Sequence, residues 1–325
     1  MTIRVLRLGK DEKDAIGEVI DSGLLASTLG HKVDEFEEEM AKYLDVDRER
    51  VIAVNSGTAA LHTLLLAHGI GPGDQVIVPA WTFISTASAV LMCGATPVFV
   101  DIDIDSFNIS PLAVEKHITP NTRAVIAVHL AGIPCDMDAL RKVCALKNLV
   151  LLEDACQALG AEWDGKKVGT LTHGGVYSFY PSKIITTGEG GMIIAPRVIV
   201  DACKILRNHG QTEKFHATTL GYNYRMTEIQ GTLGLVGLKK IEQYVDYQRS
   251  SYYEIAKQIH QMGMRISEIP EKAKIAPTYL PVWSEYAVRE HNWYIPLYKL
   301  PLFHVDGLHL PNTEHAYTFG VRLPL

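Results

Sequence analysis

The sequence predicts an α/β fold with a mostly parallel central sheet and helices packed on both of its faces. Between residues 51 and 195, short runs rich in β-branched residues alternate with segments of helical periodicity. Several runs are apolar almost throughout, which is typical of strands covered on both faces. This alternation favours parallel strands joined by helical crossovers. The expected strands are 51–54, 75–79, 96–101, 123–128, 149–153, 174–179 and 192–195.

Helical periodicity identifies the connecting elements. Residues 58–68 and 136–146 both show it, and Gly69 follows the first of them, where a helix commonly ends. A capping-box spacing begins at Thr227, and apolar residues then recur at helical spacing as far as Val245. We therefore expect one long helix that begins near Thr227 and leads out of the large domain.

Two domains of unequal size are expected. The large α/β domain covers residues 1–246 and includes an N-terminal arm, and a smaller C-terminal domain covers residues 247–325. Beyond residue 264 prolines interrupt the helical pattern repeatedly. In a mostly parallel sheet, ligands bind beyond the carboxyl ends of the strands. Functional residues are therefore expected directly after the predicted strands.

Composition excludes several classes of protein. The chain has 31 basic and 37 acidic residues, a formal net charge of −6, which argues against sequence-independent binding of nucleic acid. No apolar run approaches the length of a membrane span, and the N-terminus has no apolar signal sequence. The five cysteines are odd in number and widely spaced, as expected of free thiols in a reducing compartment. These features favour a cytoplasmic protein.

Two polar segments that follow predicted strands are candidates for a ligand site. Asn55 to Leu61 is rich in small residues and opens a helix, where free backbone amides attract a phosphate. By itself, this segment is equally consistent with a plain strand-to-helix turn. Glu153 and Asp154 end another apolar run, and an acidic residue there can also be a simple helix cap.

The segment from Ser178 to Gly191 carries the strongest signal. A predicted strand delivers Ser178, a bend at Pro181 follows, and Lys183 then stands among small, neutral and hydroxyl residues. A lone lysine in a loop is usually just solvated, but this setting suits a lysine that reacts with a carbonyl carbon. The glycines from Gly188 onward let the chain turn sharply beside it.

Other familiar motifs are incomplete. The segment from Gly160 to Lys166 begins like a phosphate-binding loop, but Lys167 occupies the position of the magnesium-binding hydroxyl. The acidic run from Asp101 begins like a calcium loop, but Ser106 replaces its turn glycine. We expect no metal site.

Five ordered segments together resemble the DegT/DnrJ/EryC1/StrS family, the sugar-aminotransferase branch of the fold type I pyridoxal-phosphate enzymes. The resemblance extends from about Gly23 to Tyr247. It rests on SGTAAL at 56–61, PAWTFISTASAV at 79–90, EDACQALGA at 153–161, SFYPSKIITTGEGGM at 178–192 and GYNYRMTEIQ at 221–230.

The resemblance implies roles for the residues around the cofactor ring. Lys183 would hold pyridoxal 5'-phosphate covalently and then move the proton between substrate carbon and cofactor carbon. Asp154 would pair with the pyridine nitrogen, which makes the ring a better electron sink. Gln157 would lie near the ring and its phenolic oxygen. Phe83 would stack on the ring, while Trp81 is offset from that position by two residues.

Further residues are implied for the phosphate and the substrate. Gly57, Thr58 and Ser178 would hold the cofactor phosphate, and Asn223 would reach it from the other subunit of a homodimer with shared active sites. Arg225 is a candidate for substrate contact. In the C-terminal domain the stretch 281–291 looks abridged against the family pattern, and the chain stops at Leu325 within the closing motif.

The function implied by the resemblance is an aminotransferase. It would move an amino group, with glutamate as the expected donor, to a keto group of a nucleotide-diphosphate-linked sugar. An aminotransferase for a cyclitol or another non-sugar ketone remains an alternative, as does a non-catalytic relative that senses a ligand. A dehydrating branch of the family has histidine in place of the lysine, so Lys183 counts against that activity.

Overall fold

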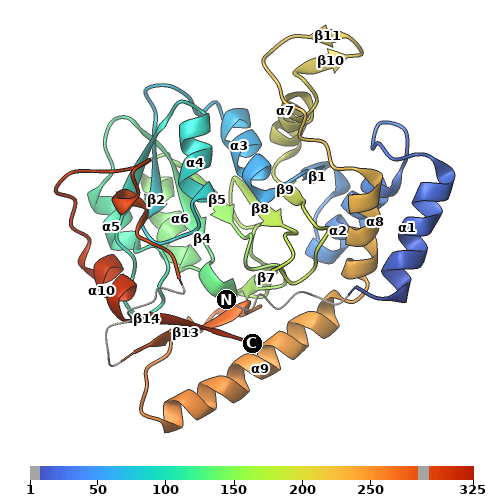
Figure 1. The fold of residues 1–325 in the computed structure, drawn as a ribbon. Coiled ribbons are helices and arrows are strands. Elements are labelled where there is room, and N and C mark those ends of the chain that lie inside the picture. Colours follow the sequence, from blue (N-terminus) through green and yellow to red (C-terminus); the bar gives the residue numbers. More distant parts are fainter. Residues whose placement is uncertain (1–7, 285–292) are drawn as a thin grey trace.

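A seven-stranded sheet forms the centre of the molecule (Figure 1) in a computed structural model that describes residues 8–284 and 293–325. The strand order is β1-β9-β8-β5-β4-β2-β3; β9 runs antiparallel to β1 and β8, and the remaining neighbours are parallel. The predicted mostly parallel sheet is therefore confirmed, and each strand lies within one residue of its expected bounds. The strands are β1 (Val51–Val54), β2 (Gln75–Pro79), β3 (Thr96–Val100), β4 (Thr122–Val128), β5 (Val150–Asp154), β8 (Gly174–Ser178) and β9 (Gly191–Ile194).

Helices cover both faces of the sheet because alternate strand residues point to opposite sides. Val51 and Ala53 of β1 face one core, and Ile52 and Val54 face the other. On the first side lie α2 (Lys32–Leu44), α5 (Pro111–Lys116), α6 (Met137–Leu146), α8 (Glu228–Leu238) and the start of α9 (Ile241–Gln261). On the second lie α3 (Gly57–Ala67), α4 (Ser85–Met92) and α7 (Arg197–Arg207). The N-terminal α1 (Lys10–Ser22) packs against α8.

The expectation of one long helix from Thr227 to Val245 is wrong. The capping box at Thr227 is present, but α8 ends at Leu238 and α9 begins at Ile241. Lys240 leaves helical geometry, with φ −107° and ψ 0°, and its N–H donates to Gly237 O in a tightened turn. Because Leu238, Ile241 and Val245 all reach the same core, the apolar spacing continues across the break and could not reveal it.

The C-terminal part of the chain packs closely on the sheet domain. The expected domain boundary at 246/247 falls inside the helix α9, and the division into two domains stays a prediction. Further along the chain, Leu297, Phe303 and Leu310 pack into the same core as α3. The smaller strands are β6 (Glu162–Trp163), β7 (Lys166–Lys167), β10 (Gln211–Glu213), β11 (His216–Ala217), β12 (Ala273–Lys274), β13 (Tyr279–Trp283) and β14 (Gly320–Pro324). The remaining helices are α10 (Pro311–Phe319) and the 3₁₀ turns η1 (Arg48–Arg50), η2 (Leu130–Gly132) and η3 (Leu297–Lys299).

The described part of the chain, residues 8–284 and 293–325, has no helix that is long and apolar enough to cross a bilayer. All five cysteines lie within it and are free thiols. Four of them are buried, and Cys156 is partly exposed beside the strand ends described below.

Candidate active site

The carboxyl ends of neighbouring strands bring the predicted residues together. Asp154 is the last residue of β5 and is paired in register with Val128 of β4 and Val176 of β8. Ser178 ends β8 two residues beyond Val176, the residue opposite Asp154. The turn η2 follows β4 at the same edge. This arrangement confirms that the strand-end segments converge, as the parallel topology requires.

Asp154 is a buried carboxylate held by neutral donors. Asp154 is 6% exposed, and its Oδ2 accepts a hydrogen bond from Thr86 Oγ1 at 2.9 Å. The other oxygen, Oδ1, accepts from the backbone N–H of Cys156 at 3.2 Å. Within residues 8–284 and 293–325, Asp154 has no ion-pair partner. A buried carboxylate with no cation at ion-pair distance favours a positively charged ligand.

Lys183 lies in the turn that leaves β8 and faces the same space. Its backbone N–H donates to Tyr180 O at 2.9 Å, which closes the turn. Burial lowers the pKa of the Lys183 amine, and the nearby charges of Cys156 and Asp154 oppose this shift without cancelling it. A larger fraction of neutral amine follows at a given pH, and only the neutral amine attacks a carbonyl carbon.

The N-terminus of α3 forms a cradle beside Ser178 and Cys156. Ser56 caps the helix by accepting from Ala59 N at 3.1 Å, and Gly57 is the first helical residue. A Cβ at Gly57 would lie 2.9 Å from Ser178 Cβ, so the absence of a side chain lets the strand end approach the helix. Thr58 Oγ1 is hydrogen-bonded to Ser85 Oγ at 2.7 Å. Free amides of a first helical turn beside hydroxyl groups suit a phosphate.

Aromatic side chains border the site on the remaining side. Gln157 is 6% exposed, and its Nε2 donates to Tyr294 Oη at 3.3 Å. Phe83 is 53% exposed, with its ring centroid 6.2 Å from that of Tyr294. Trp81 is instead buried in a separate aromatic cluster with Phe107. Phe83 is thus the exposed aromatic at this edge, and Trp81 is core.

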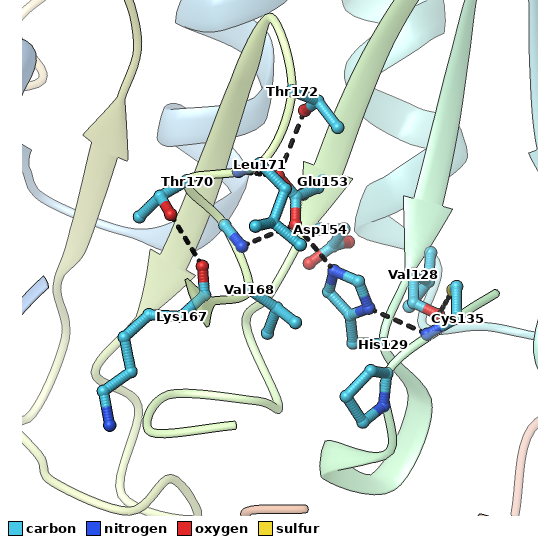
Figure 2. A network of polar contacts seen from close by, with 12 residues as sticks. Val128, His129, Cys135, Glu153, Asp154, Lys167, Val168, Thr170, Leu171 and Thr172 are labelled. Carbon is cyan, nitrogen blue, oxygen red and sulfur yellow. Dashed lines mark hydrogen bonds and ion pairs between the residues drawn. The ribbon is translucent and has the colours of Figure 1, made fainter. Parts of the chain in front are cut away.

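A buried polar network supports the strand ends from behind (Figure 2). Glu153 is fully buried and accepts hydrogen bonds from the backbone N–H groups of Gly169 at 2.6 Å and Leu171 at 2.8 Å, and from Thr172 Oγ1 at 3.1 Å. His129 Nε2 lies 3.2 Å from Glu153 Oε2. The network therefore fixes the loop 169–172 and the end of β4 to β5.

The hydrogen bonds determine the tautomer of His129. Its Nδ1 lies 3.1 Å from the backbone N of Cys135, which can only donate. Nδ1 therefore accepts and the ring proton is on Nε2, which donates to Glu153. The residue between these anchors and the ligand space is Asp154, so the network holds the carboxylate-bearing strand end in place.

Two predicted residues lie away from Lys183 within one subunit. Asn223 is exposed, and its backbone oxygen accepts from Asn55 Nδ2 at 3.3 Å. Arg225 donates to Asn208 Oδ1 at 2.7 Å and lines a different cavity of about 380 Å³ with Ser27 and Arg207. The fold of a single chain therefore does not bring either side chain into the cluster of Asp154 and Lys183.

Sequence reasoning missed several residues that complete the site. Thr86, which holds Asp154, lies in the first turn of α4, and no local pattern connects it with a strand end 68 positions away. Tyr279 and Tyr294 lie more than 120 positions from Gln157 along the chain, and no local pattern connects them. Their contribution depends on how the C-terminal segment packs.

These features define a class of enzyme. An α/β sheet presents a lysine of lowered pKa, a buried carboxylate without a cationic partner and a helix N-terminus suited to phosphate around one space. Together they fit a phosphorylated aldehyde cofactor with a ring nitrogen, bound through the lysine. The chain belongs to the DegT/DnrJ/EryC1/StrS aminotransferase family, whose model matches residues 7–325.

Curated relatives agree with this assignment. The GDP-perosamine synthase of Caulobacter vibrioides is 39% identical over 292 residues, which are 89% of this chain and 77% of that protein. The dTDP-3-amino-3,4,6-trideoxy-alpha-D-glucose transaminase of Streptomyces venezuelae is 40% identical over 232 residues, 71% of this chain and 60% of that protein. The chain thus spans about three fifths to three quarters of these relatives.

Solved structures share the fold across the chain. The aminotransferase TlmJ from Streptoalloteichus hindustanus superposes with a TM-score of 0.93 at 28% identity and covers 100% of this chain and 93% of that one. A pyridoxal-phosphate form of the sugar aminotransferase Spr1654 from Streptococcus pneumoniae gives 0.92 at 26% identity, with coverage of 100% and 93%. The predicted fold type I architecture is confirmed.

Proposed function

We propose that this chain is a pyridoxal-phosphate-dependent aminotransferase that moves an amino group from glutamate to a keto group of a nucleotide-diphosphate-linked sugar. One observation carries the proposal. The buried carboxylate of Asp154 and the amine of Lys183, whose pKa is lowered by burial, face the same space beside the N-terminus of α3. Family membership indicates the reaction class, and these residues provide the groups that would bind the cofactor and move the proton.

The bound cofactor supplies an electron sink for the carbon from which nitrogen is transferred. Asp154 keeps a proton on the ring nitrogen because a buried carboxylate strongly favours a positively charged partner. Thr86 and the N–H of Cys156 orient that carboxylate. Gly57, Thr58 and Ser178 would hold the phosphate, and Phe83, which is 53% exposed, would cover the ring.

Lys183 has two tasks. Its neutral amine would hold the cofactor through the aldehyde carbon, and the same amine, when free, would move a proton to and from the substrate carbon. The surroundings that lower its pKa serve both tasks, since each needs the unprotonated amine. Gln157 Nε2, which donates to Tyr294 Oη at 3.3 Å, would offer its second N–H to the phenolic oxygen of the ring.

The substrate class rests on the relatives. Their names specify GDP-, dTDP- and UDP-linked sugars, and they differ in the nucleotide and in the sugar. A nucleotide-linked keto sugar is the substrate class that they share. Arg225, in its cavity with Lys204 and Arg207, offers positive charge that complements a diphosphate.

The active sites are shared between two subunits in this proposal. The hairpin of β10 and β11 projects from the body above α7 (Figure 1), and it carries Phe215, which is 88% exposed. Leu220, 76% exposed, precedes the segment of Asn223. We infer that a second copy of the chain covers these apolar side chains. A second copy placed there would receive Asn223 at its own phosphate cradle. The five free thiols suit the reducing cytoplasm.

Spectroscopy of the purified protein tests the reaction class. Loaded with pyridoxal phosphate, the protein should lose its visible absorption band when glutamate is added and release one equivalent of 2-oxoglutarate per site. A nucleotide-linked keto sugar should then restore the band, whereas a cyclitol ketone that does so instead would identify the alternative substrate class. A band that glutamate leaves unchanged would support the ligand-sensing alternative.

A further inference from the structure

Tyr279 reaches the cofactor site from the C-terminal part of the chain. It is the first residue of β13 and is 8% exposed, and its Oη donates to Gln157 Oε1 at 2.8 Å. Burial raises the pKa of the Tyr279 hydroxyl, so the group remains a neutral donor across the working range of pH. The contact joins two residues that are 122 positions apart in sequence.

A second donor fixes which end of the Gln157 amide faces Tyr279. The backbone N–H of Ala131 lies 3.0 Å from Gln157 Oε1, and a backbone N–H can only donate. The atom between Ala131 and Tyr279 must therefore be the amide oxygen, and both of its lone pairs are used. The amide nitrogen is consequently directed the other way.

Backbone hydrogen bonds join the segment of Ala131 to the segment of Tyr279. Thr278 N donates to Ala131 O at 3.0 Å, and Ala276 N donates to Gly132 O at 3.1 Å. Ala131 adopts φ +58°, a left-handed conformation that costs a residue with a side chain about 1 kcal/mol. This conformation turns the Ala131 N–H toward Gln157 while its carbonyl accepts from the strand that carries Tyr279.

The nitrogen end of the amide keeps a free donor. Among the described residues, the hydrogen-bond acceptor of Gln157 Nε2 is Tyr294 Oη at 3.3 Å. An amide nitrogen carries two hydrogens, so one N–H remains for a further acceptor. The orientation of the whole group is set by the contacts on its oxygen.

We propose that Tyr279 is a positioning residue for the cofactor: together with Ala131 it locks the Gln157 amide so that Nε2 donates to the phenolic oxygen of the bound ring. The inference rests on the proposed function, because the acceptor belongs to that cofactor. It also ties the packing of the C-terminal strand β13 to the electronic state of the cofactor.

The pH titration of the visible absorption band reads this hydrogen bond without measuring turnover. A hydrogen bond donated to the phenolic oxygen stabilises the negative charge on that oxygen. The proton shared between this oxygen and the nitrogen bound to Lys183 is then lost at a lower pH. Removing the donor should raise the titration midpoint. For Gln157→Leu we expect a rise of about one pH unit. Tyr279→Phe, which leaves the amide oxygen held by Ala131 N–H alone, should give roughly half of that rise.

A double variant separates positioning from a direct effect. If Tyr279 acts through Gln157, Tyr279→Phe should add nothing to the midpoint of Gln157→Leu. The matched control is Tyr298→Phe, which removes a tyrosine hydroxyl bonded to Glu314 at 2.9 Å in the same part of the chain and should leave the midpoint unchanged.

Two results would overturn the inference. The first is an unchanged midpoint in Tyr279→Phe when Gln157→Leu shifts it, and the second is a Tyr279→Phe shift that persists in the Gln157→Leu background. A wild-type protein that shows no visible band after incubation with pyridoxal phosphate would be a different failure, because it would contradict the proposed function itself.

Discussion

Thr86 Oγ1 donates a hydrogen bond to Asp154 Oδ2 at 2.9 Å and thereby joins α4 to the end of β5. Both residues are almost fully buried. Because the other carboxylate oxygen accepts from Cys156 N, neutral donors set the direction of the carboxylate while its charge stays available to a ligand. The arrangement distinguishes a ligand-binding carboxylate from a structural one such as Glu153, whose four donors surround it completely.

Asp154→Asn should leave the cofactor bound and slow the proton-transfer step. An asparagine keeps the size and the contact with Thr86, but it cannot hold the ring nitrogen protonated. We expect the rate constant of the glutamate half-reaction to fall by at least tenfold, or about 1.4 kcal/mol of barrier. Stopped-flow absorbance measures it. The control Thr86→Val, which keeps the charge, should lose less. A loss well under tenfold in Asp154→Asn would mean that the residue is structural.

The lowered pKa of Lys183 predicts how stability depends on pH in the cofactor-free protein. Between that lowered pKa and the ordinary value of 10.5, the unfolded chain binds more protons than the folded one. Folding stability contributed at this site therefore rises with pH across that window. Lys183→Met should be more stable than the wild type near neutral pH, and the difference should shrink as pH approaches 10. Urea unfolding measures both proteins, and parallel pH profiles would contradict the burial of the amine.

Glu153→Gln tests the supporting network. The substitution removes the negative charge and places the amide NH₂ against the backbone N–H of either Gly169 or Leu171, which can only donate. We expect a loss of about 3 kcal/mol in the free energy of unfolding, since the donors lose a buried charged acceptor. Glu35→Gln is the matched control, because Glu35 is half exposed and pairs with Lys32, and should cost below about 1 kcal/mol. Equal losses in the two variants would show that the network contributes little.

Shared active sites predict complementation between two inactive proteins. Lys183→Ala removes the covalent attachment, and Asn223→Trp places a bulky side chain where the neighbouring subunit would bind phosphate. A mixed dimer contains one site with both defects and one intact site, so mixing should restore partial activity. The large replacement is needed because losing one phosphate hydrogen bond costs only about 1.5–3 kcal/mol. No recovery, with subunit exchange shown independently, would mean that each site is built from one chain.

The sheet was predictable because its strands are buried on both faces, so that each strand is a nearly continuous apolar run in the sequence. All seven strands follow their expected bounds within a residue, and Asp154 and Ser178 lie at strand ends as the topology demands. The break between α8 and α9 was not predictable, because Leu238 and Ile241 continue the apolar spacing across it. Periodicity reports which side of a segment is buried, and it does not report whether the backbone is continuous.

The candidate site divides in the same way. Lys183, Asp154 and Gly57 lie in segments whose small residues, strand ends and turns can be recognised from the local sequence. Tyr279 depends on a contact with Gln157 across 122 positions, and its own neighbourhood looks like an ordinary apolar strand. Asn223 could be placed at a site only through the family resemblance, since a single chain leaves it exposed.

The central claim is that Lys183 is the lysine that binds the cofactor. Borohydride reduction of the protein loaded with pyridoxal phosphate makes the carbon–nitrogen bond permanent, and peptide mass spectrometry then locates the added mass. The account predicts near-stoichiometric modification of the peptide containing Lys183, and loss of both the modification and turnover in Lys183→Ala. Modification at a different lysine, or an unchanged visible band in Lys183→Ala, would contradict it.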